Sequence, residues 1–298
     1  MKHETRAGLL LFLTAVIWGF AMAAQREGSR YLSPMTFNAF RFTLGAAALW
    51  PMMLRENRKQ KAPLTLREAL PGVGLGAVLF IASLLQQMGV GASGAGKAGF
   101  LTALYVVLVP LLGLAFGRRT HPSAWMALGL ALPALYLLCV PAGERFSLEP
   151  NDSALLIGAV FWALHILLTD RFGERVSALK LCAVQFTAGA VLNWVLALLL
   201  EEISPENLLR AFVPAAYCGF LSTGLGYYLQ TVGQKHCPPA VAALLLSLES
   251  VFCVIAGALL LGERMDARGY AGCALMLLAV ALAQAGNMRE SRKEKNHV

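Results

Sequence analysis

The chain has 298 residues, of which 57% are hydrophobic and only 14% are charged, and its mean hydropathy is +0.61. Soluble domains carry about 25% charged residues because their surfaces face water, so this composition excludes an ordinary soluble protein and indicates a membrane protein. The formal net charge is +8. The basic residues fall in short connections and at the C-terminus rather than along one aromatic-rich face, so we expect no nucleic-acid partner. The six cysteines form no C-x-x-C pair, which predicts neither a metal site nor a disulfide framework.

Ten apolar stretches are long enough to cross the roughly 30 Å hydrocarbon core as helices of about 20 residues. In chain order they cover residues 7–24, 35–54, 70–90, 98–117, 123–141, 153–169, 181–200, 211–233, 240–261 and 269–287. None shows the alternation of apolar and polar residues that marks strands of a membrane β-barrel. The sequence therefore predicts an all-α membrane protein with ten transmembrane helices.

The sequence matches itself, without a gap, when it is shifted by 144 residues. Two tryptophan pairs align in this register, Trp18 with Trp162 and Trp50 with Trp194. Further identical pairs are Phe42/Phe186, Thr43/Thr187, Gly45/Gly189, Leu85/Leu229, Gln86/Gln230, Gly89/Gly233 and Gly113/Gly257. Each copy holds five spans, an odd number, so we expect the second copy to cross the membrane in the opposite sense. Such inverted repeats are a recurring plan of secondary transporters.

The repeat divides the chain. We expect a first five-helix repeat at residues 1–145, a second, inverted five-helix repeat at 150–288 and a basic cytoplasmic tail at 289–298. The charged start, the apolar run and the small residues Ala21 and Ala23 also resemble a cleavable signal peptide. Because residues 7–24 form the first element of the repeat, we expect them to remain as a membrane helix.

Basic residues are unequally divided between the two sides of the predicted membrane. An even number of spans places both termini on one side, which holds seventeen of the 25 Lys and Arg residues, against seven on the other side and Arg41 within a span. Cytoplasmic loops are enriched in Lys and Arg. We therefore expect a multi-pass protein of the cytoplasmic (inner) membrane with both termini in the cytoplasm.

The stretch GASGAGKA at 91–98 has the spacing of a phosphate-binding loop, with Gly91, Gly96 and Lys97 in the pattern G-x-x-x-x-G-K. Ala98 replaces the Ser or Thr that would hold magnesium, no strand precedes the glycines, and the stretch falls on the external side. We interpret it as a tight turn between two membrane helices. We expect no ATP, no other cofactor and no bound metal.

Two stretches resemble a known family. They are AGFLTALYVVLVPLLGLAFGRR at 98–119 and LLLSLESVFCVIAGALLLGER at 244–264. Together with the ten spans, the two halves and a tryptophan early in the first helix of each half, they resemble the drug/metabolite transporter (DMT) superfamily, EamA type. Ser250 stands where that family often has proline. The resemblance implies movement of small metabolites, amino acids in some members, through a central cavity.

Ionisable side chains inside a span are costly and so are candidates for function. Glu249 lies midway along its segment and is a candidate proton carrier or contact for a substrate amine. Alternatively, it is a structural acid paired with Arg41 or held by Gln86 and Gln230. Arg41 is a possible substrate charge, or it neutralises Glu249 or binds carbonyl groups at a helix end.

Polar and aromatic residues within the spans complete the predicted substrate site. His165 shares a helical face with Trp162 and either lines a cavity or ties two helices together. Gln86 and Gln230 suit a pseudo-symmetric centre or hydrogen bonds between helices. The remaining candidates are aromatic residues that stack on a substrate or pack between helices: Trp18, Tyr105, Trp162 and Tyr227.

The leading functional hypothesis is a secondary transporter that exports a small polar or zwitterionic metabolite, such as an amino acid, by alternating access. A single basic residue within the spans argues against phosphate esters and nucleotide sugars. A lipid flippase or a passive channel of the same fold is the alternative. No G-x-S-x-G or H-E-x-x-H motif or pair of intramembrane aspartates is present, so we expect no enzyme. The sequence leaves monomer and homodimer equally open.

Overall fold

The computed structural model describes residues 2–93, 95–117, 120–140, 143, 149, 152–261 and 266–296, and within these the chain is helical with no strand. The helices before residue 140 are α1 (Lys2–Gly28), α2 (Pro34–Gln60), α3 (Leu66–Ser93), α4 (Ala95–Ala103), α5 (Tyr105–Ala115) and α6 (Pro122–Cys139). Those after residue 150 are α7 (Asp152–Gly173), α8 (Ala178–Leu200), α9 (Pro205–Arg210), α10 (Phe212–Ala216), the π-helix η1 (Tyr217–Gly226), α11 (Tyr227–Gln234), α12 (Pro239–Leu246), α13 (Glu249–Leu261) and α14 (Ala267–Asn296).

Polar residues and prolines mark the helix starts. Ser33 precedes Pro34 at the start of α2, and proline suits the first helical turn because its missing N–H needs no partner there. The Ser177 side chain accepts a hydrogen bond from the backbone N–H of Lys180 and caps α8. At the start of α3, Glu68 accepts hydrogen bonds from the backbone N–H and the hydroxyl of Thr65. These starts fall in the polar connections that separate the predicted spans.

Eight helical segments in the described residues are long and apolar enough to cross a membrane. They are His3–Gly28, Leu66–Val90, Ala98–Ala115, Pro122–Cys139, Asp152–Gly173, Ala178–Leu200, Pro239–Leu260 and Ala267–Arg289, and each corresponds to one of the ten predicted spans.

The other two predicted spans, 35–54 and 211–233, differ for separate reasons. α2 contains Asn38 and Arg41, which lower its hydropathy although both side chains are buried inside the protein. Residues 211–233 form three short consecutive elements, α10, η1 and α11, rather than one α-helix.

Two of the eight segments are interrupted near the middle. α5 begins at Tyr105, directly after a turn at Leu104, and α13 begins at Glu249, directly after a turn at Ser247 and Leu248. Leu104 and Leu248 are separated by the 144 residues of the sequence repeat. The two breaks therefore occupy the same position in both halves of the sequence, and each is followed by a polar side chain.

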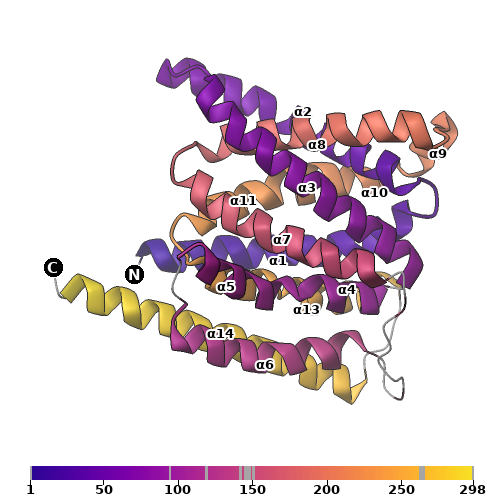
Figure 1. Ribbon diagram of the computed structural model, residues 1–298. Helices are drawn as coiled ribbons and strands as arrows, with labels where there is room; N and C mark the ends of the chain where they lie inside the picture. Colours follow the sequence, from indigo (N-terminus) through magenta and orange to yellow (C-terminus); the bar gives the residue numbers. More distant parts are fainter. Residues whose placement is uncertain are drawn as a thin grey trace.

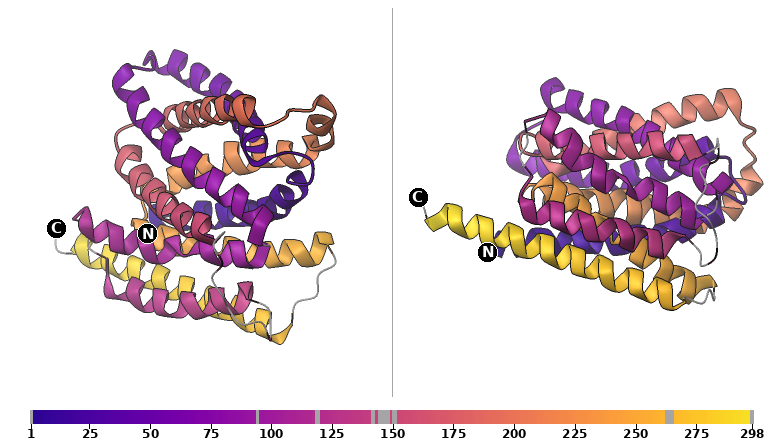
Figure 2. Two further views of the ribbon diagram at one scale, coloured as in Figure 1. Left: turned by 45° about the vertical axis from the view of Figure 1, so that its right-hand side comes forward. Right: turned by 60° about the horizontal axis from the view of Figure 1, so that its bottom comes forward.

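The helices form a bundle in which α6 and α14 pack along each other at one edge and α2 and α8 pack along each other at the opposite edge (Figures 1 and 2). α1, α7 and the two broken segments lie between these pairs (Figure 1). The N and C termini lie at the same end of the bundle (Figure 1).

Reciprocal hydrogen bonds join α2 to α8. Trp50 donates its indole N–H to the hydroxyl of Thr187 at 2.8 Å, and Trp194 donates its indole N–H to the hydroxyl of Thr43 at 2.9 Å. Each partner in the first bond aligns with its counterpart in the second when the sequence is shifted by 144 residues. Phe42 and Phe186, which also align, stack with centroids 6.3 Å apart and an interplanar angle of 11°. Equivalent side chains of the two halves therefore meet across this interface.

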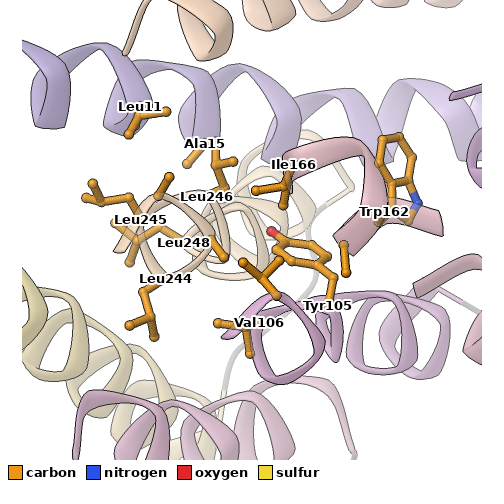
Figure 3. Packing of buried hydrophobic residues seen from close by; sticks show 14 of the residues in the cluster. Leu11, Ala15, Tyr105, Val106, Trp162, Ile166, Leu244, Leu245, Leu246 and Leu248 are labelled. Carbon is orange, nitrogen blue, oxygen red and sulfur yellow. The ribbon is translucent and has the colours of Figure 1, made fainter. Parts of the chain in front are cut away.

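A hydrophobic plug fills the part of the bundle nearer the termini. Leu11 on α1, Val106 on α5, Ile166 on α7 and Leu245 on α12 are all buried in it (Figure 3). The polar side chains described next lie beyond this plug, away from the termini along α1.

Candidate functional site

A cavity, here called the central cavity, lies between α1, α2, α3, α4, α5, α7, η1, α11 and α13. Its walls combine aromatic, polar and charged side chains. They come from Trp18, Ala21, Met22, Gln25, Arg41, Gln86, Thr102, Tyr105, Trp162, Ile166, Ser222, Tyr227, Gln230 and Glu249. Seven of the eight predicted substrate-site residues, together with Arg41, therefore border one space.

Three rings form an aromatic wall. Tyr227 lies between the two tryptophans that align in the repeat, with its centroid 4.8 Å from that of Trp18 and 6.4 Å from that of Trp162. Trp18 is fixed by a hydrogen bond from its indole N–H to the carbonyl oxygen of Ser222 at 3.2 Å. The indole N–H of Trp162 is buried and has no hydrogen-bond partner among the described residues. The aromatic wall therefore offers a flat apolar surface, and one of its rings carries an indole N–H with no hydrogen-bond partner in the described residues.

Arg41 contributes a buried positive charge. Its residue is 2% exposed, and its guanidinium carbon lies 5.0 Å from the centroid of the adjacent Phe42 ring. The Nε and one terminal nitrogen are buried without a hydrogen-bond partner in the described residues. A buried cation is destabilising unless an anion or hydrogen-bond acceptors compensate it. The cavity therefore presents an uncompensated cationic group.

Glu249 contributes the carboxylate. Its side chain accepts a hydrogen bond from the hydroxyl of Tyr105, with 3.3 Å between the phenolic oxygen and Oε1. Both residues are the first of their helix, directly after the breaks in the two halves, so the break geometry turns both side chains toward the cavity. In the part of the chain that the structure describes, no ion pair joins Glu249 to Arg41.

The two repeat-related glutamines also border the cavity. Gln86 is 8% exposed and Gln230 is 1% exposed. The side-chain oxygen of Gln230 and the hydroxyl of Thr102 are buried without hydrogen-bond partners in the described residues. A polar occupant would satisfy these groups, because buried polar atoms are normally hydrogen-bonded.

His165 lies behind the aromatic wall and does not line the cavity. Its Nε2 lies 3.0 Å from the side-chain oxygen of Gln185, which joins α7 to α8. Its ring meets Tyr227 edge to face at 5.6 Å and Trp162 at 6.1 Å. Of the two interpretations of His165, the structure matches the tie between helices, which also holds the aromatic rings.

The sequence interpretation missed several lining residues, among them Met22, Gln25, Thr102, Ile166 and Ser222. Met22 and Ile166 are separated by 144 residues, so the repeat register relates these two missed residues to each other. Gln25, Thr102 and Ser222 carry no such signal, since small polar residues are common at helix–helix contacts in membranes. The GASGAGKA stretch, expected as a turn, is largely helical, because α3 continues to Ser93 and α4 begins at Ala95; Gly94 lies outside the described residues.

Comparison with known proteins agrees with this arrangement. A transporter of Archaeoglobus fulgidus, named only as an uncharacterized transporter, is 26% identical over 280 residues, covering 93% of this chain and 85% of its own. The threonine/homoserine exporter RhtA of Escherichia coli K12 is 27% identical over 303 residues, covering 95% of this chain and 94% of its own. A solved crystal structure superposes with a TM-score of 0.78 at 19% identity, covering 95% of this chain and 98% of the other, which shows a shared fold.

A profile of the EamA-like transporter family matches the chain twice, at residues 5–140 and 151–284. Together these matches span nearly the whole sequence, and the relatives described above are named transporters. With its membrane-spanning helices, the chain is a multi-pass membrane protein of the DMT superfamily. It belongs to the EamA-like transporter family.

Proposed function

We propose that this protein is a secondary transporter that exports a small zwitterionic metabolite, such as an amino acid, across the cytoplasmic membrane by alternating access. The observation that carries the proposal is that Arg41 and Glu249 border the same cavity without pairing with each other in the described residues. A zwitterion carries both a negative group, which Arg41 can bind, and a positive group, which Glu249 can bind.

The carboxylate of the substrate would bind Arg41. A guanidinium group offers paired N–H donors that match the two oxygens of a carboxylate. The free indole N–H of Trp162 adds a further donor in the same cavity. A single cation compensates one negative charge, which disfavours phosphate esters and nucleotides.

The ammonium group of the substrate would bind Glu249. Tyr105 donates to Oε1 of Glu249, which fixes the carboxylate while leaving acceptor capacity for a substrate N–H. The side-chain oxygen of Gln230 is a second free acceptor of this cavity. The same carboxylate is also our candidate for coupling transport to protons, with Tyr105 and Arg41 as its neighbours in the cavity.

The name of RhtA supports an amino acid as substrate, because that relative is named as a threonine/homoserine exporter. Those substrates carry the same carboxylate and ammonium groups that Arg41 and Glu249 would bind. We therefore propose that the substrate of this protein shares the zwitterionic head group of the substrates named for RhtA, and we propose no particular side chain from that name.

We also propose that α2 and the α10–η1–α11 segment cross the membrane, which gives ten spans in two inverted five-helix repeats at 1–145 and 150–288. The reciprocal hydrogen bonds of Trp50 with Thr187 and of Trp194 with Thr43 support this arrangement, because a twofold axis would exchange the two bonds. Burial of Asn38 and Arg41 allows α2 to lie in the membrane without exposing either side chain to lipid.

We propose that both termini and the tail 289–298 lie in the cytoplasm, and the excess of basic residues on one side supports this orientation. The hydrophobic plug around Leu11 and Leu245 then closes the cytoplasmic side, and the central cavity faces outward. The opposite state would require the plug to open while the external side closes.

The proposal is tested with purified protein in liposomes and a labelled panel of amino acids, polyamines, sugars and nucleosides, with and without a pH gradient. We expect saturable movement of amino acids, driven by the gradient, and its loss in Arg41→Met. Loss of the gradient effect in Glu249→Gln would support proton coupling at this carboxylate. Non-saturable flux would indicate a channel instead, and movement of fluorescent lipids with an inert panel would indicate a flippase.

A further inference from the structure

A second cavity adjoins the central cavity. The two share the lining residues Met22, Gln86, Thr102 and Glu249. We call the second one the apolar subsite and define it by the residues that line it alone: Gly99, Leu138, Cys139, Ser250, Cys253 and Val254. The Glu249 side chain stands at the boundary between the two spaces.

The walls of the apolar subsite carry no charge apart from this boundary carboxylate. Leu138 and Val254 are aliphatic, and the thiols of Cys139 and Cys253 behave as small polarizable apolar groups. Ser250 contributes the one hydroxyl among the six residues. Such a surface stabilises an apolar group and leaves a charged one without partners.

An amino acid also has charged groups and, in many cases, an apolar side chain, which correspond to the charged central cavity and to the apolar subsite. Its α-carbon bears a carboxylate, an ammonium group and a side chain that point in three directions. With the carboxylate at Arg41 and the ammonium at Glu249, the α-carbon lies near the boundary between the two cavities. The side chain then has the adjoining space beyond Glu249 available to it.

We propose that the apolar subsite receives the side chain of the transported amino acid and selects uncharged, predominantly apolar side chains such as those of leucine and methionine. The inference rests on the proposed function, since it takes the zwitterionic head group as given. It differs from the substrates in the name of RhtA, whose side chains are short and bear a hydroxyl.

Gly99 leaves room in the subsite, because it has no side chain. A Cβ atom at this position would meet only the sulfur of Cys139, at 3.9 Å, which is ordinary contact. A Cβ atom at residue 99 therefore causes no backbone clash, and we expect a leucine side chain there to extend into the subsite. Gly129 on α6 is a matched control, because it is exposed and a Cβ atom there meets nothing within 4 Å.

The test measures counterflow of labelled leucine, methionine, phenylalanine, alanine, threonine and lysine in liposomes for the wild type, Gly99→Leu, Leu138→Ala and Gly129→Leu. Burial of a leucine-sized side chain is worth roughly a tenfold to hundredfold change in affinity. We expect the wild type to have a half-saturation concentration at least about tenfold lower for leucine than for alanine. Gly99→Leu should abolish this preference and leave alanine within about twofold, whereas Gly129→Leu should change neither.

Leu138→Ala keeps the inference testable if Gly99→Leu fails to fold, because it enlarges the subsite and should shift the preference from leucine toward phenylalanine. Amino-acid transport without preference for apolar side chains would overturn the subsite and keep the proposed function. Equal losses for leucine and alanine in folded Gly99→Leu would also overturn it. A wild-type protein that moves no amino acid at all would overturn the proposed function itself.

Discussion

Tyr105 and Glu249 stand 144 residues apart, each begins a helix after a break, and the hydroxyl of Tyr105 donates to Glu249 across 3.3 Å. They align when the sequence is shifted by 144 residues, yet one is a phenol and the other a carboxylate. Positions that align in the sequence therefore contribute different chemical groups to one site. The donor fixes the acceptor, so the carboxylate presents a defined face to the central cavity.

Tyr105→Phe removes this donor and keeps the ring. We expect the half-saturation concentration for a transported amino acid to rise about threefold to tenfold, because one hydrogen bond contributes about 0.5–1.5 kcal/mol. Tyr136→Phe is the control, since no hydrogen bond of its hydroxyl occurs in the described part of the chain. Unchanged transport kinetics in Tyr105→Phe would show that Glu249 needs no positioning by the phenol.

Arg41→Met should abolish transport and at the same time stabilise the protein. The guanidinium is buried with unpaired nitrogens, and replacing such a charge by an apolar side chain of similar length removes a desolvation cost on the order of 1–4 kcal/mol. Thermal unfolding in detergent measures the change. Arg30→Met, which removes an exposed ion pair with Glu27, should change stability by less than about 1 kcal/mol. A lower Tm in Arg41→Met would mean that the cation is structural.

If the two reciprocal hydrogen bonds between α2 and α8 are equivalent, removing either one should destabilise the protein to a similar extent. Trp50→Phe and Trp194→Phe each remove one indole donor from a Thr hydroxyl, so each should cost about 0.5–1.5 kcal/mol, and the two costs should be similar. Trp125→Phe, whose indole makes no hydrogen bond in the described residues, serves as the control. Unequal losses at Trp50 and Trp194 would argue against equivalent roles for the two halves at this interface.

Close packing of α1 on α13 depends on Gly19. A Cβ atom there would overlap Cβ of Phe252 and lie 2.8 Å from the backbone nitrogen of Cys253. Gly19→Ala should therefore destabilise the protein by about 1–3 kcal/mol or prevent folding. Gly129→Ala has open space and should be neutral or stabilising by up to about 1 kcal/mol, as alanine favours a helix. Equal thermal stability of the two variants would contradict this packing.

The sequence predicted the helical class and the positions of the eight qualifying spans, because length and hydropathy decide both. It also identified most of the residues that border the central cavity, since polar and aromatic groups in a membrane helix are conspicuous. The breaks at Leu104 and at Ser247–Leu248 were not predicted, because neither contains glycine or proline. The π-helix Tyr217–Gly226 was missed for a related reason, as its hydrogen-bond register depends on packing against α1 and α2.

His165 illustrates the limit of reading a site from one helix face. Its spacing from Trp162 places both on one side of α7, but the partner that decides its role, Gln185, comes from α8. Which atom faces a cavity and which faces a neighbouring helix depends on contacts between distant segments. Periodicity along a single helix carries no information about those contacts.

The central claim is that Arg41 and Glu249 hold the two opposite charges of one substrate. Its most direct test is competition in liposome counterflow between a transported amino acid and analogues that lack one charge. For leucine these are isopentylamine, without the carboxylate, and isocaproate, without the ammonium group. We expect neither analogue to compete at concentrations at which unlabelled leucine competes fully. Effective competition by either analogue would contradict the account, because one of the two charged residues would then be unnecessary for binding.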